Sequence, residues 1–176
     1  SISALLEECK MLQDIGIDPF KNLYLSDMCP IIIPSHQAID LARESKLAKS
    51  KIGTTGRGIG TTYEDKVGRR SVRISDLYDE SKLNDKLTQA LDFYNSIFEH
   101  SFGTSKIDLN ELVDLNLKQA EQLKPYIGNV IDEIRELQKS KKKILYEGAQ
   151  GALLDVSLGT YPFVTSSNLI GGVPAG

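Results

Sequence analysis

Glycine and hydroxyl residues gather in one short segment, IGTTGRGIG, whose residue types suit the binding of an anion. Its four glycines within eight residues are Gly53, Gly56, Gly58 and Gly60. Glycine tolerates positive φ, so successive N–H groups can converge on a phosphate, while Thr54, Thr55 and Arg57 add side-chain donors. The segment lacks the P-loop pattern GxxxxGKS/T and the glycine spacing of a dinucleotide fingerprint. A phosphate site and a flexible surface turn therefore stay open as equal alternatives.

A charged cluster, YEDKVGRRSVR, follows directly. On a continuous helix its cations would cover adjoining faces at spacings of three and four residues, and they are Lys66, Arg69, Arg70 and Arg73. One interpretation pairs them with Glu64 and Asp65 on an exposed helix. The other sends one arginine outward to bind a phosphate through two nitrogens, a geometry that lysine lacks. Composition does not decide between the two.

A third candidate segment follows the apolar run ILY at 144–146, which predicts a buried strand at about 144–147. The strand would open into a loop rich in glycine and hydroxyls, a common ligand position in α/β proteins. Gln150 carries an amide donor and a carbonyl acceptor, as recognition of a purine edge requires. Further polar residues of the loop are Thr160, Thr165, Ser166, Ser167 and Asn168. A capped turn of small polar residues is the equally open alternative.

The elements that must position these segments are mainly helices. Ser1 or Ser3 can cap a first helix that Gly16 ends, with a strand at about 23–26 and a helix at 35–48 to follow. From about 75 to 140 the pattern is helical, and Pro125 is expected to separate two helices. Its two apolar stripes, expected to form core, are Leu83, Leu87, Ala90, Leu91 and Tyr94, then Ile127, Val130, Ile131, Ile134 and Leu137.

Bulk composition excludes several classes of function. The 176 residues are 40% hydrophobic and carry a formal net charge of −3, which is typical of a soluble globular protein and argues against a general grip on nucleic acid. No apolar run approaches the ~20 residues of a membrane helix. Cys9 and Cys29 are expected to be reduced thiols in a cytoplasmic protein. His36 and His100 have no neighbouring Cys or His, so structural or surface roles and no metal site are expected.

Together, the segments closely resemble the signature of adenylosuccinate synthetases. IGTTGRGIG with YEDKVGRR, then EGAQGALLD with GTYPFVTSSN, occur in the family's order and at a similar separation. The stretch LYLSDMCPIIIPSHQAIDLARE also resembles the family, so the similarity covers nearly the whole chain. The resemblance implies a Mg²⁺-dependent ligase of purine (AMP) biosynthesis, which uses GTP to join IMP and L-aspartate through a 6-phosphoryl-IMP intermediate.

The resemblance also implies roles for individual residues. Thr55 and Thr165 are similar to the threonines that contact the IMP phosphate. Gln150 is similar to the catalytic glutamine that contacts the hypoxanthine ring and helps to orient the phosphorylated 6-oxygen. Arg69 resembles the arginine that reaches across a homodimer interface to the partner's IMP. The residues that match a mobile loop around the IMP site are Gly53, Thr54, Gly56 and Arg57.

Fold and extent are implied in the same way. The family's fold is α/β and resembles that of the P-loop NTPases. This chain is expected to form one partial domain over 1–176, with an incomplete sheet and a helical insertion at about 75–140. The family's GDEGKGK loop and its guanine-recognition segment, which hold most of the GTP and Mg²⁺ contacts, are not found in these residues. An internal fragment without turnover of its own is therefore expected.

Three residues depart from the family's pattern. Thr61 stands where proline is usual, which suggests a less rigid helix entry, and Ser157 and Leu158 stand where many members have Asp and His. Two other interpretations stay open. One is a non-catalytic nucleotide-binding or interaction module derived from the enzyme, and the other is a different phosphate-binding α/β enzyme with convergent glycine loops.

Overall fold

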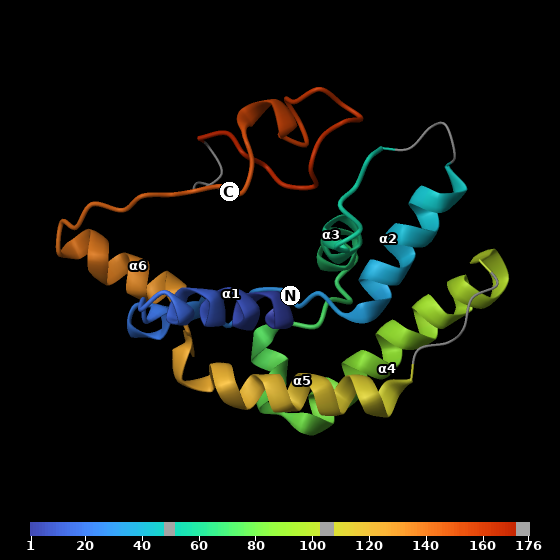
Figure 1. Cartoon of the computed structure of the whole chain (residues 1–176), viewed down its shortest axis with the longest axis horizontal. Helices are drawn as coiled ribbons and strands as arrows, with labels where there is room; N and C mark the ends of the chain where they lie inside the picture. The colour runs from blue at the N-terminus through green and yellow to red at the C-terminus, as the bar shows by residue number, and fades with distance from the viewer. Residues whose placement is uncertain (48–51, 103–107, 172–176) are drawn as a thin grey trace.

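The computed structural model of the protein describes residues 1–47, 52–102 and 108–171 and is mostly helical (Figure 1). Its α-helices are α1 Ile2–Asp14, α2 Pro34–Lys46, α3 Ile59–Val67, α4 Glu80–Ile97, α5 Leu109–Leu123 and α6 Val130–Lys139. Its strands are β1 Leu25–Ser26 and β2 Ile127–Gly128, and its shorter turns are Pro19–Lys21, Ile74–Tyr78, Phe98–Phe102, Lys124–Tyr126 and Ala152–Leu154. No helix in these ranges is long and apolar enough to cross a membrane.

Local sequence explains where the helices begin and end. Ser1 caps α1 by accepting the backbone N–H of Ala4 at 3.3 Å, and Gly16, with φ at +82°, follows its C-terminal end as predicted. Pro125 lies in the short turn between α5 and α6, because it has no N–H for a continuing helix. The predicted separation of two helices at this residue is therefore confirmed.

β1 and β2 form a two-stranded parallel sheet, with Leu25 opposite Ile127 and Ser26 opposite Gly128. β1 lies within the strand predicted at 23–26. Ile127 belongs to a strand and not to the helical stripe in which the sequence pattern placed it. A small parallel sheet among helices is consistent with the incomplete α/β fold that the sequence predicts.

The strand predicted at 144–147 is wrong. These residues lie in an irregular link between α6 and the C-terminal loop, drawn in orange in Figure 1. Leu145 is 88% exposed and Tyr146 53% exposed. A strand needs a neighbour for its backbone hydrogen bonds and a surface for its apolar side chains, and the described part of the chain offers this link neither.

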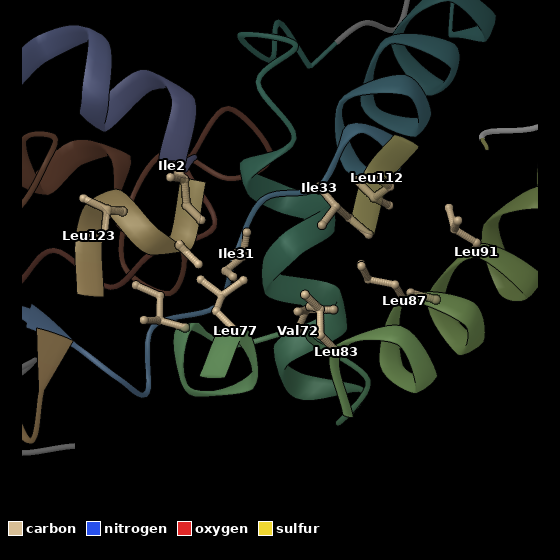
Figure 2. Packing of buried hydrophobic residues seen from close by; sticks show 13 residues of the cluster. Ile2, Ile31, Ile33, Val72, Leu77, Leu83, Leu87, Leu91, Leu112 and Leu123 are labelled. Atoms are coloured by element: carbon tan, nitrogen blue, oxygen red, sulfur yellow. The ribbon is translucent and has the colours of Figure 1, made fainter. Parts of the chain in front are cut away.

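The main hydrophobic core joins α4 and α5 to the segment 31–33 (Figure 2). The first predicted stripe is confirmed, since its residues are all buried: Leu83, Leu87, Ala90, Leu91 and Tyr94. Ile31 and Ile33 enter this core from the other side, and the N–H of Ile31 donates to the carbonyl of Val72 at 2.8 Å. Burial of each large apolar side chain contributes about 1.5–3 kcal/mol.

Apart from Ile127, which lies in β2 and packs against the core, the second predicted stripe forms a helix but not a core. None of the residues of α6 is buried, and Ile131 is 56% exposed. The helix itself is well capped, because the side chain of Asn129 accepts the N–H groups of Ile131 and Asp132. An apolar stripe becomes core only where other elements cover it fully, and Val130, Ile134 and Leu137 are no more than half-buried.

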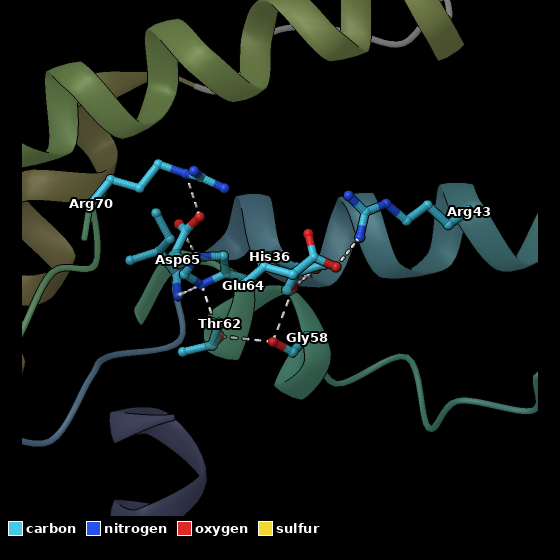
Figure 3. A network of polar contacts seen from close by, with 9 residues as sticks. His36, Arg43, Gly58, Thr62, Glu64, Asp65 and Arg70 are labelled. Carbon is cyan, nitrogen blue, oxygen red and sulfur yellow. Dashed lines mark hydrogen bonds and ion pairs between the residues drawn. The ribbon is translucent and has the colours of Figure 1, made fainter. Parts of the chain in front are cut away.

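A buried polar network joins the start of α2 to α3 (Figure 3). Nδ1 of His36 accepts the N–H of Ile33 at 3.0 Å, so the ring proton lies on Nε2, which donates to Asp65 at 2.8 Å. Nε of Arg70 lies 2.6 Å from the other carboxylate oxygen, and its guanidinium covers the ring of Phe93. His36 and Asp65 are each 1% exposed, so both have a structural role here.

The pKa of Asp65 lies below its ordinary value. Burial alone would raise this pKa, but the hydrogen bond from His36, the neighbouring Tyr94 side chain and the charge of Arg70 outweigh burial. The unfolded chain therefore binds this proton more readily than the folded protein does. The resulting stability is complete above the unfolded pKa of about 3.9 and is lost as the pH falls through the lower, folded pKa.

Leu87→Ala should lower the free energy of unfolding by about 2–5 kcal/mol, because it leaves a cavity in the core. Leu145→Ala is the matched control and should change this free energy by less than about 0.5 kcal/mol, since Leu87 is 0% and Leu145 88% exposed. Urea unfolding followed by circular dichroism measures both variants. Equal losses would contradict the assignment of the core.

Asp65→Asn should lower the free energy of unfolding by about 3 kcal/mol near neutral pH, because it removes the buried carboxylate with which Arg70 forms an ion pair. The deficit relative to the unchanged protein should shrink as the pH falls below about 3.9 and through the lower, folded pKa of Asp65. Urea unfolding across this pH series measures it. Asp92→Asn, on an exposed position of α4, is the control, and a deficit that stays constant in acid would refute the argument.

Candidate functional site

The glycine-rich segment is held against one face of α2. The two carboxylate oxygens of Glu44 accept the backbone N–H groups of Ile52 and Gly53, each at 3.2 Å. One helical turn earlier, the carboxylate of Asp40 accepts the N–H of Gly58 at 3.0 Å. Two carboxylates four residues apart on the same helix face therefore hold the two ends of the segment 52–58.

Gly58 is the point of closest contact between this segment and α2. Its φ is +76°, and a Cβ there would come within 2.8 Å of the backbone of His36 and Gln37, so both conformation and space require glycine. Its carbonyl accepts the hydroxyl groups of Thr61 and Thr62, at 3.0 and 2.7 Å. The start of α3 is thereby fixed relative to α2.

The C-terminal loop is organised around the buried carboxylate of Asp155. This carboxylate accepts the backbone N–H of Leu169 at 2.6 Å, of Leu158 at 2.9 Å and of Ser157 at 2.8 Å. These hydrogen bonds, with that from Leu169 foremost, keep the pKa of Asp155 below its ordinary value. One side chain thus joins residues at both ends of the loop.

A cavity of about 340 Å³ lies between the glycine-rich segment and the C-terminal loop. The predicted site residues that line it are Gly53, Thr54, Thr55, Gln150 and Thr165. A neighbouring cavity of about 850 Å³ shares Asp40 with it and extends along α2 and α3. Gly60 and Ser166 line both cavities, and a Cβ on Gly60 would lie 3.1 Å from the Ser166 hydroxyl. Segments far apart in the sequence therefore meet at one concave surface.

Three predicted residues line neither cavity: Gly56, Arg57 and Arg69. Gly56, with φ at +66°, lies beside α2, where a Cβ would come within 2.7 Å of the Leu41 side chain. Arg57 and Arg69 are both exposed. Neither of their side chains has an ion pair with another described residue, so both guanidinium groups remain available to a ligand or a partner.

The sequence pattern suggested one continuous helix for the four cations of the charged cluster, but the structure does not have one. α3 ends at Val67, and Arg69 has a left-handed φ of 63°. Arg70 turns inward to Asp65, which agrees with the ion-paired interpretation for this one residue. The exposed side chain of Arg69 is compatible with the outward-reaching arginine of the other interpretation.

Sequence reasoning missed the two carboxylates that hold the glycine-rich segment. Asp40 lines both cavities and Glu44 lines the larger one. Their spacing of four residues on a predicted helix, directly before the glycines, was a usable signal. Ser166 was noted only as one hydroxyl among several, although it lines both cavities.

The departures from the family's pattern have simple structural settings. Thr61 is buried and its hydroxyl lies 2.9 Å from the carbonyl of His36, so this side chain ties the start of α3 to α2. The expected loss of rigidity at this helix entry is therefore offset by a hydrogen bond. Ser157 and Leu158 have exposed side chains and contact Asp155 through their backbone N–H groups, which other residue types would supply equally.

The lining of the smaller cavity combines three kinds of groups. Hydroxyl groups come from Thr54, Thr55, Thr165 and Ser166. Gln150 supplies an amide, while Leu154 and Phe163 supply apolar surface. Hydroxyls and backbone N–H groups can bind a phosphate, and an amide beside apolar groups can bind a heterocyclic base. Among the described residues no group of three or more His, Cys, Asp or Glu side chains could hold a metal ion.

The whole chain matches one protein family, since the family model described as adenylosuccinate synthetase covers residues 1–176. The adenylosuccinate synthetase of Hahella chejuensis is 48% identical over 169 residues, which are 96% of this chain and 39% of that protein. That of Nitrosomonas eutropha is 45% identical over 172 residues, 98% of this chain and 40% of that protein. The chain therefore spans well under half of the length of these relatives.

A solved structure agrees with the sequence comparison. It is described as fully ligated adenylosuccinate synthetase from Plasmodium falciparum and matches 99% of this chain and 40% of its own. The TM-score is 0.86 at 32% sequence identity. Because a family match over all 176 residues, relatives above 40% identity and a shared fold agree, the chain belongs to the adenylosuccinate synthetase family, ligases of purine biosynthesis.

Proposed function

We propose that the chain supplies part of the IMP site of an enzyme that joins IMP to L-aspartate at the expense of GTP, in the cytoplasm. The cavity of about 340 Å³ carries this proposal, because Thr55, Gln150 and Thr165 all line it. These three residues come from two segments separated by almost a hundred positions. Their convergence on one cavity is the arrangement that a bound nucleotide requires.

The phosphate group of IMP is assigned to the threonine side of the cavity. Thr55 lies on the exposed glycine-rich segment and Thr165 on the C-terminal loop, and both line the cavity, so hydroxyl donors from two segments can contact the anion. Neutral donors bind a phosphate without fixing its protonation state. Arg69, on the surface beyond α3, supplies the cationic contact from the partner subunit of a homodimer.

Gln150 is assigned to the hypoxanthine ring. Its amide can accept from a ring N–H and donate to a ring oxygen or nitrogen at the same time. In the proposed reaction the 6-oxygen takes the γ-phosphoryl group of GTP, and the amine of aspartate then attacks C6 and displaces phosphate. Gln150 holds the ring so that the 6-oxygen is positioned for phosphorylation and C6 is then positioned for attack by the amine.

The chemistry of GTP and Mg²⁺ is not assigned to these residues. No cluster of metal-binding side chains occurs in the described ranges, so no step of the reaction is placed on a metal held here. Turnover is proposed to require the GDEGKGK loop of the family, which these 176 residues do not contain. The contribution of this chain is binding and orientation of IMP.

The proposal of a homodimer is supported by the larger cavity. It is lined by apolar groups of Tyr63, Val67 and Tyr161, and Val67 and Tyr161 are 79% and 78% exposed. Exposed apolar side chains around a concave surface are typical of an interface. Arg69 lies two residues after the end of α3, the helix that carries Tyr63 and Val67, and from there it can reach a second copy of the chain.

Gln150→Ala should weaken the binding of IMP about tenfold or more, because the ring loses a donor and an acceptor. Calorimetric titration of the purified chain with IMP measures this change. Gln138→Ala, at an exposed position of α6, is the matched control and should bind IMP as the unchanged chain does. Absence of IMP binding by the unchanged chain, or equal weakening in both variants, would refute the proposed site.

Arg69→Ala should weaken IMP binding about tenfold or more, because a charged hydrogen bond from the partner subunit is lost. Sedimentation velocity with and without IMP should show that IMP favours the dimer of the unchanged chain but not of the variant. Arg135→Ala, on exposed α6, is the control. Full-strength IMP binding by a strictly monomeric chain would contradict a role across the interface.

A further inference from the structure

The segment 52–58 is attached to α2 at two ends that differ in strength. At Gly58 the attachment is buried: Asp40, which is 8% exposed, accepts the N–H, and two threonine hydroxyls reach the carbonyl. At Ile52 and Gly53 the partner of both N–H groups among the described residues is the carboxylate of Glu44, a half-buried residue, and both hydrogen bonds are exposed. Exposed hydrogen bonds at 3.2 Å exchange readily with water or with another acceptor.

Glu44 binds two backbone donors of residues that line the cavity of the proposed phosphate position. Gly53 lines the cavity of about 340 Å³ next to Thr54 and Thr55. Its N–H points instead at an oxygen of Glu44, and a second oxygen of the same carboxylate takes the N–H of Ile52. A carboxylate that accepts two neighbouring backbone N–H groups satisfies them in the way that a phosphate would.

The charge of Glu44 also opposes a phosphate. The carboxylate lies within hydrogen-bond distance of Gly53, so an anion at the glycine-rich segment would lie close to a like charge. Asp40 adds a second carboxylate at the border of both cavities, but its hydrogen bond to Gly58 is buried. Of the two carboxylates, Glu44 is therefore the one that can release its partners without exposing a buried polar group.

We propose that Glu44 is a positioning residue of the nucleotide site, which holds the N–H groups of Ile52 and Gly53 in the ligand-free protein and releases them when a phosphate group binds. Asp40 keeps Gly58 in place in both states, so the segment moves about that end. This inference rests on the proposed IMP site for the identity of the phosphate. The ligand-free contact itself does not depend on that site.

Two variants separate the hydrogen bonds of Glu44 from its charge. Glu44→Ala removes both, and Glu44→Gln keeps one acceptor oxygen without the charge. Glu8→Ala, on an exposed position of α1, removes the same charge far from the cavities and is the control. Because the contacts of Glu44 exist only without ligand, Glu44→Ala should bind IMP about three- to tenfold more tightly, with Glu44→Gln in between.

Amide hydrogen exchange, measured by NMR without any ligand, tests directly whether Glu44 protects the N–H groups of Ile52 and Gly53. In Glu44→Ala, the N–H groups of Ile52 and Gly53 should exchange about fivefold faster or more, while the N–H of Gly58 should be unchanged. Unchanged exchange at Ile52 and Gly53 would overturn the inference whatever IMP does. If the contact of Glu44 with these N–H groups does not compete with a phosphate group, Glu44→Ala should bind IMP as tightly as the unchanged chain or more weakly. Either result would also overturn the proposal.

Titration with IMP then distinguishes this inference from the proposed function. Binding by Glu44→Ala that is tighter than that of the unchanged chain supports both. Failure of the unchanged chain and of both variants to bind IMP overturns the proposed function and the releasing step together. Faster exchange in Glu44→Ala would in that case show that Glu44 holds the segment, with no nucleotide to release it.

Discussion

The contact between α2 and α3 determines the geometry of the glycine-rich side of both cavities. Two small helices can take many relative positions when only apolar surface joins them, because the hydrophobic effect has little directional preference. Here the buried pair of His36 and Asp65 adds direction, since both atoms of the hydrogen bond are 1% exposed and each has further partners. Any other orientation would leave a buried charge unpaired, at a cost of several kcal/mol.

The position of the glycine-rich segment depends on the contact between α2 and α3. Gly58 fits against the backbone of α2 only because it has no side chain, and the hydroxyls of Thr61 and Thr62 fasten its carbonyl to the first turn of α3. The N–H donors of Ile52 and Gly53 are then held by the carboxylate of Glu44 on α2. Electrostatics, glycine conformation and helix packing thus act on the same few residues, so that an anion site can be built on a segment without secondary structure.

Sequence reasoning succeeded where a local apolar pattern has another element of the fold to pack against. Leu87 and its stripe were predicted as core because the period of the apolar residues is helical, and α5 is present to cover them. The ILY run at 144–146 has an equally apolar pattern, but Leu145 is exposed because a pattern cannot report whether a neighbouring strand exists. Asp40 and Glu44 were missed for a related reason. Their partners are backbone N–H groups of glycine and isoleucine, which no side-chain motif records.

The two halves of the proposed site are stabilised by different means. The half at 52–58 is attached to α2, whose Ile39 packs with Tyr94 and Phe98 in a buried cluster, so its position depends on the folded core. The half at 150–169 is organised by Asp155 within its own loop and follows an exposed link at 144–147. Ser166 against Gly60 is a close contact between the halves, and it relies on a missing side chain at Gly60. Since α6 and the link both present uncovered apolar groups, their burial by a further surface would fix the loop that carries Gln150 and leave the α2 half as it is. The position of the loop that carries Gln150 is therefore less fixed by the buried core than that of the α2 half.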